Sequence, residues 1–81
     1  MSYVILFDVL ECATRMATTP ELTTLYPHPF RLLDDDGRVY YYGRSRTCDD
    51  DEAFAPLDWG KGDSGCTSVE YLDRYGDWIQ L

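Results

Sequence analysis

The 81-residue sequence is poor in the residues that metal, disulfide and nucleic-acid sites require. It has one histidine and three widely separated cysteines, whereas structural zinc sites use these residues in closely spaced pairs. Three is an odd number, so we expect reduced thiols in a cytoplasmic protein rather than a secreted disulfide scaffold. The sequence has seven basic residues and fifteen acidic ones. This shortage of lysine and arginine argues against direct binding to nucleic acid.

Long hydrophobic runs are also absent. The first ten residues, MSYVILFDVL, are largely apolar, but no basic segment precedes them. Asp8 and Glu11 interrupt the run well short of the roughly 18 apolar residues that a membrane span needs. We therefore expect neither a signal peptide nor a membrane anchor.

What the sequence does contain is enough apolar material for one folded domain over residues 1–81. Hydrophobic residues make up 44% and aromatic residues 15%, which argues against disorder despite the charge. The net charge is −8, and nine of the fifteen acidic residues lie between positions 34 and 63. The negative electrostatic field of such a chain favours association with basic surfaces.

The N-terminal quarter predicts helix, with one alternative. Between residues 2 and 18 the apolar side chains recur at helical spacing. These residues are Leu6, Val9, Leu10, Ala13, Met16 and Ala17. The segment Tyr3–Phe7 is rich in strand-forming residues, so the alternative is a short strand there that leads into a helix. Pro20 either ends this helix or begins a second short one, for which Glu21–Tyr26 would supply the turn, since proline suits a first helical turn.

The remaining chain predicts two β-hairpins. Phe30–Leu33 and Arg38–Gly43 are strand-like and are joined by a turn that contains Asp-Gly. Thr67–Leu72 and Trp78–Leu81 form the second pair, and residues 44–65 look loop-like. The expected fold is α+β, with one or two N-terminal helices packed on an antiparallel sheet of about four strands.

No motif predicts an enzyme, a metal site or a cofactor. The tetrapeptide GDSG at residues 62–65 matches the nucleophile motif of chymotrypsin-like serine proteases, but His28 is the only possible base and nothing places it near Ser64. With Gly37 at position 6 of an EF-hand loop, Gly43 occupies the position that requires glutamate. No two acidic residues are set apart by an apolar environment. We expect no catalysis.

The tyrosine-rich strand predicts a half-exposed face. Strict alternation places Val39 and Tyr41 on one face of the strand and Tyr40 and Tyr42 on the other. Since tyrosine and arginine are enriched at protein interfaces, Tyr40, Tyr42 and Arg44 are candidate binding residues. A strand covered on both sides is the alternative. Two loop aromatics, Phe54 and Trp59, and Trp78 in the last strand are expected to pack in the core.

The acidic runs are the other candidate surface. A hairpin tip needs one or two aspartates, so the rest exceed what the turn requires. Packing like charges together lowers stability, which favours a functional use, and regularly spaced carboxylates can stand in for a phosphate backbone. The candidate partner-facing residues are Asp34, Asp35, Asp36, Asp49, Asp50, Asp51, Glu52, Asp58 and Asp63.

In size and composition the whole chain resembles the small acidic phage-encoded anti-CRISPR proteins, especially those thought to mimic DNA, and is similar in character to acidic anti-restriction proteins. The resemblance implies a non-enzymatic inhibitor in the cytoplasm of a prokaryotic host cell. It would act as a DNA mimic that occupies the basic DNA-binding surface of a type I CRISPR surveillance complex. Three arginines within the acidic segment, Arg38, Arg44 and Arg46, depart from a uniform negative face. The alternative is a phage or plasmid structural or assembly protein that self-associates through its tyrosine face, although we expect a monomer.

Overall fold

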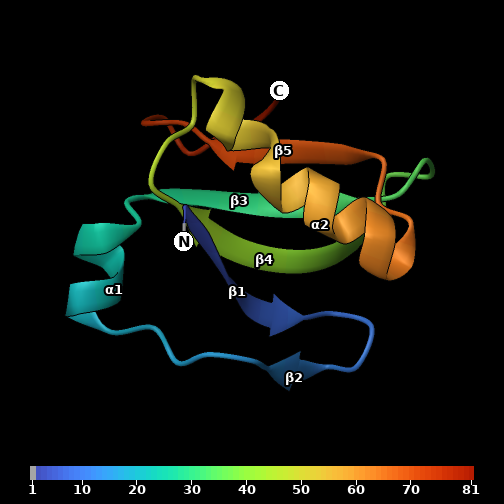
Figure 1. Cartoon of the computed structure of the whole chain (residues 1–81), viewed down its shortest axis with the longest axis horizontal. Coiled ribbons are helices and arrows are strands. Elements are labelled where there is room, and N and C mark those ends of the chain that lie inside the picture. Colours follow the sequence, from blue (N-terminus) through green and yellow to red (C-terminus); the bar gives the residue numbers. More distant parts are fainter. Residues whose placement is uncertain (1) are drawn as a thin grey trace.

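Six strands form one antiparallel sheet in the order β2–β1–β4–β3–β5–β6. The computed structural model describes residues 2–81 (Figure 1). The strands are β1 (Tyr3–Asp8), β2 (Ala13–Thr14), β3 (His28–Leu33), β4 (Val39–Ser45), β5 (Ser68–Leu72) and β6 (Trp78–Gln80). The helices are α1 (Pro20–Leu25), the 3-10 helix η1 (Asp51–Phe54) and α2 (Ala55–Ser64). The α+β class is confirmed, whereas the prediction of about four strands was too small.

The predicted N-terminal helix was wrong. The alternative, a strand at Tyr3–Phe7 leading into a helix, is confirmed for the strand only, because β1 is followed by a turn and β2. Pairing with β4 gives these strand-forming residues a hydrogen-bonded neighbour. Asp8 accepts a hydrogen bond from the N–H of Glu11 (3.1 Å), and Cys12 adopts a positive φ of 52°, so the chain turns back into β2. The helical spacing of the apolar residues creates no buried stripe, since Leu10 and Met16 are 56% and 43% exposed.

Of the two alternatives at Pro20, the one in which it begins a short helix is confirmed as α1. The side chain of Thr19 accepts a hydrogen bond from the N–H of Leu22 (3.1 Å), which caps the helix, and Pro20 occupies its first turn. None of its residues is fully buried. In Figure 1 it lies at one end of the sheet, apart from α2.

Both predicted hairpins are confirmed. β3 pairs with β4 across a turn that contains Gly37 at φ +81°, and β5 pairs with β6 across a turn that contains Gly76 at φ +85°. The central strand β3 joins the two hairpins by pairing with β5. β1 and β2 then extend the sheet beyond β4, which the prediction of two hairpins did not include.

The predicted loop over residues 44–65 was wrong, because η1 and α2 form a helical segment there. Asp50 caps its start by accepting a hydrogen bond from the N–H of Glu52 (3.0 Å), and Pro56 lies in the first turn of α2. Gly65 ends it at φ +75°, with its N–H donating to the carbonyl of Lys61 (3.3 Å). In Figure 1, α2 crosses one face of the sheet.

The hydrophobic core lies between α2 and the sheet face beneath it. The buried residues of this core are Phe30, Leu32, Tyr41, Ala53, Leu57, Cys66, Val69 and Tyr71. Trp59 packs against them edge-on to Tyr41, with ring centroids 4.8 Å apart, as predicted. Phe54 is 41% exposed and Trp78 lies outside this cluster, so the prediction of two further core aromatics was wrong. Within residues 2–81, no helix is long and apolar enough to cross a membrane.

Candidate binding surfaces

The first acidic run, Asp34–Asp36, forms the tip of the β3–β4 hairpin. One carboxylate oxygen of Asp34 accepts hydrogen bonds from the N–H groups of Asp36 and Arg38, both at 2.9 Å. The bond from Arg38 is the main reason that the pKa of Asp34 lies below its usual value. A hydrogen bond to Asp34 raises the pKa of Tyr40. Asp35 and Asp36 are exposed. The turn therefore uses Asp34 and leaves the other two carboxylates to solvent.

The second acidic run, Asp49–Glu52, forms the start of η1. Asp49 accepts a hydrogen bond from the hydroxyl of Thr47 (3.2 Å), and Asp50 is the N-cap. Asp51 and Glu52 lie in the first turn, where carboxylates interact favourably with the unpaired N–H groups of a helix start. The run therefore has a local structural role, which the sequence did not reveal. All four residues are nevertheless exposed.

The two remaining acidic candidates lie on α2 in different environments. Asp58 is exposed in the first turn, and its charge adds to the effect of burial in raising the pKa of Tyr3. Asp63 accepts a hydrogen bond from the hydroxyl of Tyr41 (2.5 Å). Burial is the main reason that the pKa of Tyr41 is raised, and this bond adds to it. Asp63 thus ties the end of the helix to the sheet.

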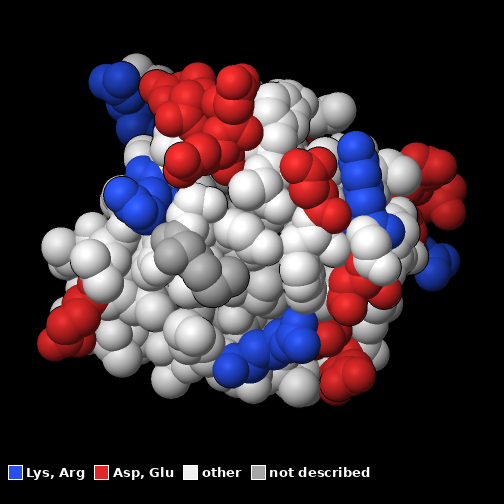
Figure 2. Space-filling model, viewed as in Figure 1, with Lys and Arg blue, Asp and Glu red and all other residues white. Residues whose placement is uncertain are grey.

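The acidic candidates are separated into groups rather than joined in one stripe. Figure 2 shows a large acidic group at the top, where Figure 1 places the chain near residue 50, and smaller groups along the right side. Basic side chains and uncharged surface lie between them. Within residues 2–81 the only ion pair joins Arg31 to Glu70 (2.7 Å). No intramolecular ion pair in that range neutralises any of the nine candidates.

A bulge separates Tyr40 from Tyr42 and Arg44, the two residues with which it was predicted to share a face. The register between β3 and β4 shifts between Leu32 and Leu33, which leaves Tyr40 as an extra residue that packs against the core. Tyr42 is 38% exposed. Arg44 is held by the carbonyls of Tyr26 (2.7 Å) and Pro27 (3.0 Å). The strict alternation assumed from the sequence therefore fails at Tyr40.

The sheet face that α2 does not cover carries a row of polar and aromatic residues that the sequence did not indicate. Strand pairing aligns Phe7, Tyr42, Arg31, Glu70 and Gln80 across five strands. The guanidinium of Arg31 also lies 4.4 Å from the ring centroid of Trp78, which is 6.2 Å from that of Tyr42. Only the register, which is a property of the tertiary fold, brings these residues together.

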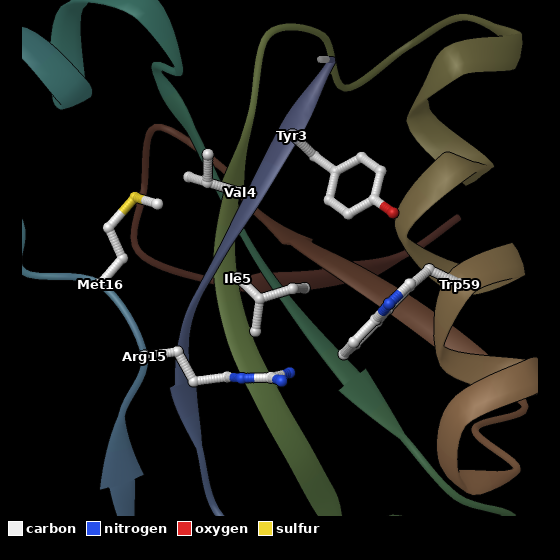
Figure 3. Close-up of a pocket in the computed structure, with 6 residues that line it drawn as sticks. All are labelled: Tyr3, Val4, Ile5, Arg15, Met16 and Trp59. Carbon is white, nitrogen blue, oxygen red and sulfur yellow. The ribbon is translucent and has the colours of Figure 1, made fainter.

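A cavity of about 280 Å³ lies beside the N-terminal half of β1. Figure 3 shows its six lining residues. They are Tyr3, Val4, Ile5, Arg15, Met16 and Trp59. The guanidinium carbon of Arg15 lies 5.6 Å from the ring centroid of Trp59. Three segments that are distant in the sequence meet here, and no local pattern predicted the site.

The structure also shows the surroundings of two residues that could act as nucleophiles, Ser64 and Cys66. Ser64 is hydrogen-bonded to the hydroxyl of Tyr41 (2.6 Å), while His28 belongs to β3. Cys66 is buried, and burial raises the pKa of its thiol, which disfavours the reactive thiolate. Among residues 2–81, no group of three or more histidine, cysteine or acidic side chains is placed to hold a metal ion. No family model, curated protein or solved structure matches the chain.

Proposed function

We propose that this chain is a non-enzymatic binding protein whose acidic surface occupies the basic nucleic-acid-binding surface of a protein partner. The observation that carries the proposal is the cluster Asp49–Glu52, in which four consecutive acidic residues are exposed at the start of a helix. The only ion pair within residues 2–81 lies elsewhere, on β3 and β5. A charge group held in place and left unneutralised favours a partner of the opposite charge.

The candidate acidic residues divide into two groups, according to whether their carboxylates make a hydrogen bond within the chain. Asp34, Asp49, Asp50 and Asp63 each use a carboxylate oxygen in an internal hydrogen bond. Five others make no hydrogen bond or ion pair through their carboxylates within residues 2–81. These are Asp35, Asp36, Asp51, Glu52 and Asp58. The second group supplies the carboxylates that are fully available to a partner.

The specific target that we propose is the DNA-binding surface of a type I CRISPR surveillance complex in a prokaryotic cell. Support comes from the size and acidic composition that the chain shares with DNA-mimicking inhibitors of such complexes. A groove lined with lysine and arginine binds DNA through its phosphates. Exposed carboxylates attached to a fixed helix start offer a comparable negative surface.

The deciding experiment replaces Asp49, Asp50 and Asp51 together by asparagine. Asparagine also caps helices well, so the fold should survive while three charges are lost. We expect affinity for a purified type I surveillance complex to fall at least about tenfold, and binding of the parent protein to weaken steeply between about 50 and 200 mM salt. DNA competition and binding assays measure both.

The matched control changes three exposed carboxylates elsewhere, in the variant Glu11→Gln/Glu21→Gln/Asp77→Asn. It alters the net charge by the same amount, so its affinity should remain close to that of the parent protein. Unchanged affinity in the Asp49–Asp51 variant would show that the proposed surface is wrong. Equal losses in both variants would show that only the net charge matters.

A second candidate function is self-association through the sheet face that carries Tyr42, as expected of a structural or assembly protein. The observation that favours it is the exposure of Tyr42 beside Trp78 on a face that α2 does not cover. This association would be largely insensitive to salt. Sedimentation of the parent protein and of Tyr42→Ala distinguishes the two functions, since a parent protein that remains monomeric excludes self-association.

A further inference from the structure

The outer edge of β1 is bare over its N-terminal half. β2 pairs with β1 only at Phe7 and Asp8. In the part of the chain that the structure describes, Tyr3–Ile5 therefore has a neighbouring strand, β4, on one side only. Figure 1 shows β1 continuing past the end of β2 while the chain after β2 runs toward α1. A bare edge presents unpaired backbone groups on which another extended chain can pair.

The strand register identifies which backbone groups are unpaired. The N–H of Arg46 donates to the carbonyl of Ser2 (2.8 Å), on the β4 side of β1. Because hydrogen-bonded pairs alternate along an antiparallel ladder, Val4 bonds inward to β4, and the N–H and C=O groups of Tyr3 and Ile5 point outward. These outward groups have no partner within residues 2–81. The edge thus offers two donors and two acceptors to an extended backbone.

The cavity beside this edge gives the occupant a second point of contact. In Figure 3, Tyr3 and Trp59 lie on one side of β1 and Met16 on the other, while Arg15 extends beneath Ile5 toward Trp59. The volume of about 280 Å³ lies just below the range for small-molecule pockets, and suits one large apolar side chain. Pockets beside a strand edge give side-chain specificity to an interaction that the backbone supplies.

The net charge of the chain indicates what flanks that apolar side chain. Asp58, which is close enough to Tyr3 to affect its ionisation, is exposed and forms no ion pair within residues 2–81. The positive charge of Arg15 is directed at the ring of Trp59. The whole chain carries −8. Arg44 and Arg46 also lie beside this edge, because they pair with Val4 and Ser2. It is therefore the net charge of the chain that disfavours a second copy and attracts a partner segment with lysine or arginine.

We propose that the Tyr3–Ile5 edge binds an extended segment of a protein partner by strand addition. The segment carries a large apolar side chain that enters the cavity beside Met16 and Trp59, flanked by lysine or arginine. This binding mode uses backbone groups and a different surface from Asp49–Glu52, so it does not depend on the function proposed above.

The test uses short synthetic peptides that alternate valine and threonine, carry lysine at both ends and have phenylalanine, leucine, tryptophan or alanine at the centre. Amide hydrogen exchange of the full chain is followed by NMR. Binding should slow the exchange of the Tyr3 and Ile5 amides at least about tenfold, while the Val4 amide, which already bonds to β4, changes little. Peptides with a large central residue should bind more tightly than the alanine peptide.

Three controls separate the parts of the proposal. N-methylation of alternate peptide amides should abolish binding, and exchanging the terminal lysines for glutamates should weaken it by roughly fivefold. Met16→Trp, which fills the cavity from an exposed position, should weaken binding at least about tenfold, whereas Leu10→Trp, at an exposed position that does not line the cavity, should not.

Several results would overturn the proposal. One is the absence of binding by every peptide up to about 1 mM. Another is binding that leaves exchange at Tyr3 and Ile5 unchanged, or that Met16→Trp does not affect. Protection of the two amides that rises with protein concentration, without peptide, would mean that a second copy occupies the edge. The Asp49–Asp51 asparagine variant should still bind the peptides, which distinguishes this site from the acidic surface.

Discussion

One carboxylate oxygen of Asp34 organises the turn between β3 and β4. It accepts hydrogen bonds from two backbone N–H groups, and the backbone of Asp34 also bonds to Arg38 and Gly37. Asp35 contributes no such bond, although it lies in the same turn and is of the same residue type. At the scale of single residues, therefore, identical side chains in one acidic run have different roles.

We expect the contribution of Asp34 to stability to depend on pH. Its pKa in the folded protein lies below the ordinary value of 3.8, mainly because of the hydrogen bond from the N–H of Arg38. Such a carboxyl stabilises the fold above its unfolded pKa, and the contribution is lost as pH falls through the lower, folded pKa. Asp34→Ala should therefore lower the free energy of unfolding near neutral pH, and the difference from the parent protein should shrink below about pH 4.

Urea unfolding over a range of pH measures this difference. Asp35→Ala is the matched control and should change the unfolding free energy little at any pH, since Asp35 is exposed and makes no bond in the turn. A deficit in Asp34→Ala that is the same at acidic and neutral pH would contradict the role assigned to its charge.

At the scale of elements, the sequence predicted those whose signals are local. Asp-Gly marked the first hairpin and Pro20 the start of α1, because turn and cap chemistry depends on a few adjacent residues. The segment Tyr3–Phe7 remained ambiguous because its apolar spacing fits both a helix and a strand. Pairing with β4 decides the outcome, and that partner is distant in the sequence.

α2 could not be predicted because its stability comes from packing rather than from helix propensity. Gly60 and Gly62 lie inside it, and glycine is a poor helix former. Gly60 is buried where a Cβ atom would lie 2.9 Å from Cδ1 of Leu32, so its lack of a side chain permits close contact with the sheet. Gly62 has nothing within 4 Å of such an atom.

The two glycines therefore predict opposite effects within one helix. Gly62→Ala should raise the free energy of unfolding by about 0.5–1 kcal/mol, since alanine favours helix and the position is open. Gly60→Ala should lower it by about 1–3 kcal/mol, because the new methyl group overlaps Leu32 and crowds Cys66. Chemical denaturation of both variants tests the difference. Equal stabilisation would show that α2 does not pack against the sheet as closely as described.

At the scale of the whole molecule, the exposure of the acidic residues was easier to predict than their grouping. Consecutive acidic residues such as Asp49–Glu52 face solvent in almost any fold, because burying unpaired charge is costly. Their distance from Asp34–Asp36 depends on where η1 and the hairpin lie. The bulge at Tyr40 and the cavity beside Trp59 likewise depend on strand register and on contacts between distant segments.

The charge of the whole molecule predicts that salt stabilises it. The chain carries −8, and residues 2–81 contain one ion pair. Its extents are 31 × 26 × 24 Å. At about 0.01 M salt the screening length is about 30 Å, so carboxylates repel one another across the entire molecule, whereas at about 0.15 M it is about 8 Å and only neighbours interact. Self-repulsion lowers the stability of the folded state.

We therefore expect the thermal midpoint to rise by roughly 4–8 °C per kcal/mol of repulsion removed as sodium chloride increases from about 0.01 to 0.15 M. Circular dichroism melts measure the midpoint. The variant Glu11→Gln/Glu21→Gln/Asp77→Asn has three fewer negative charges, so it should melt higher than the parent protein at low salt and gain less from added salt. A midpoint that falls with salt would mean that attractive pairs outweigh repulsion. That result would also weaken the functional proposal, because the proposed binding to a basic partner requires carboxylates that are not already neutralised within the chain.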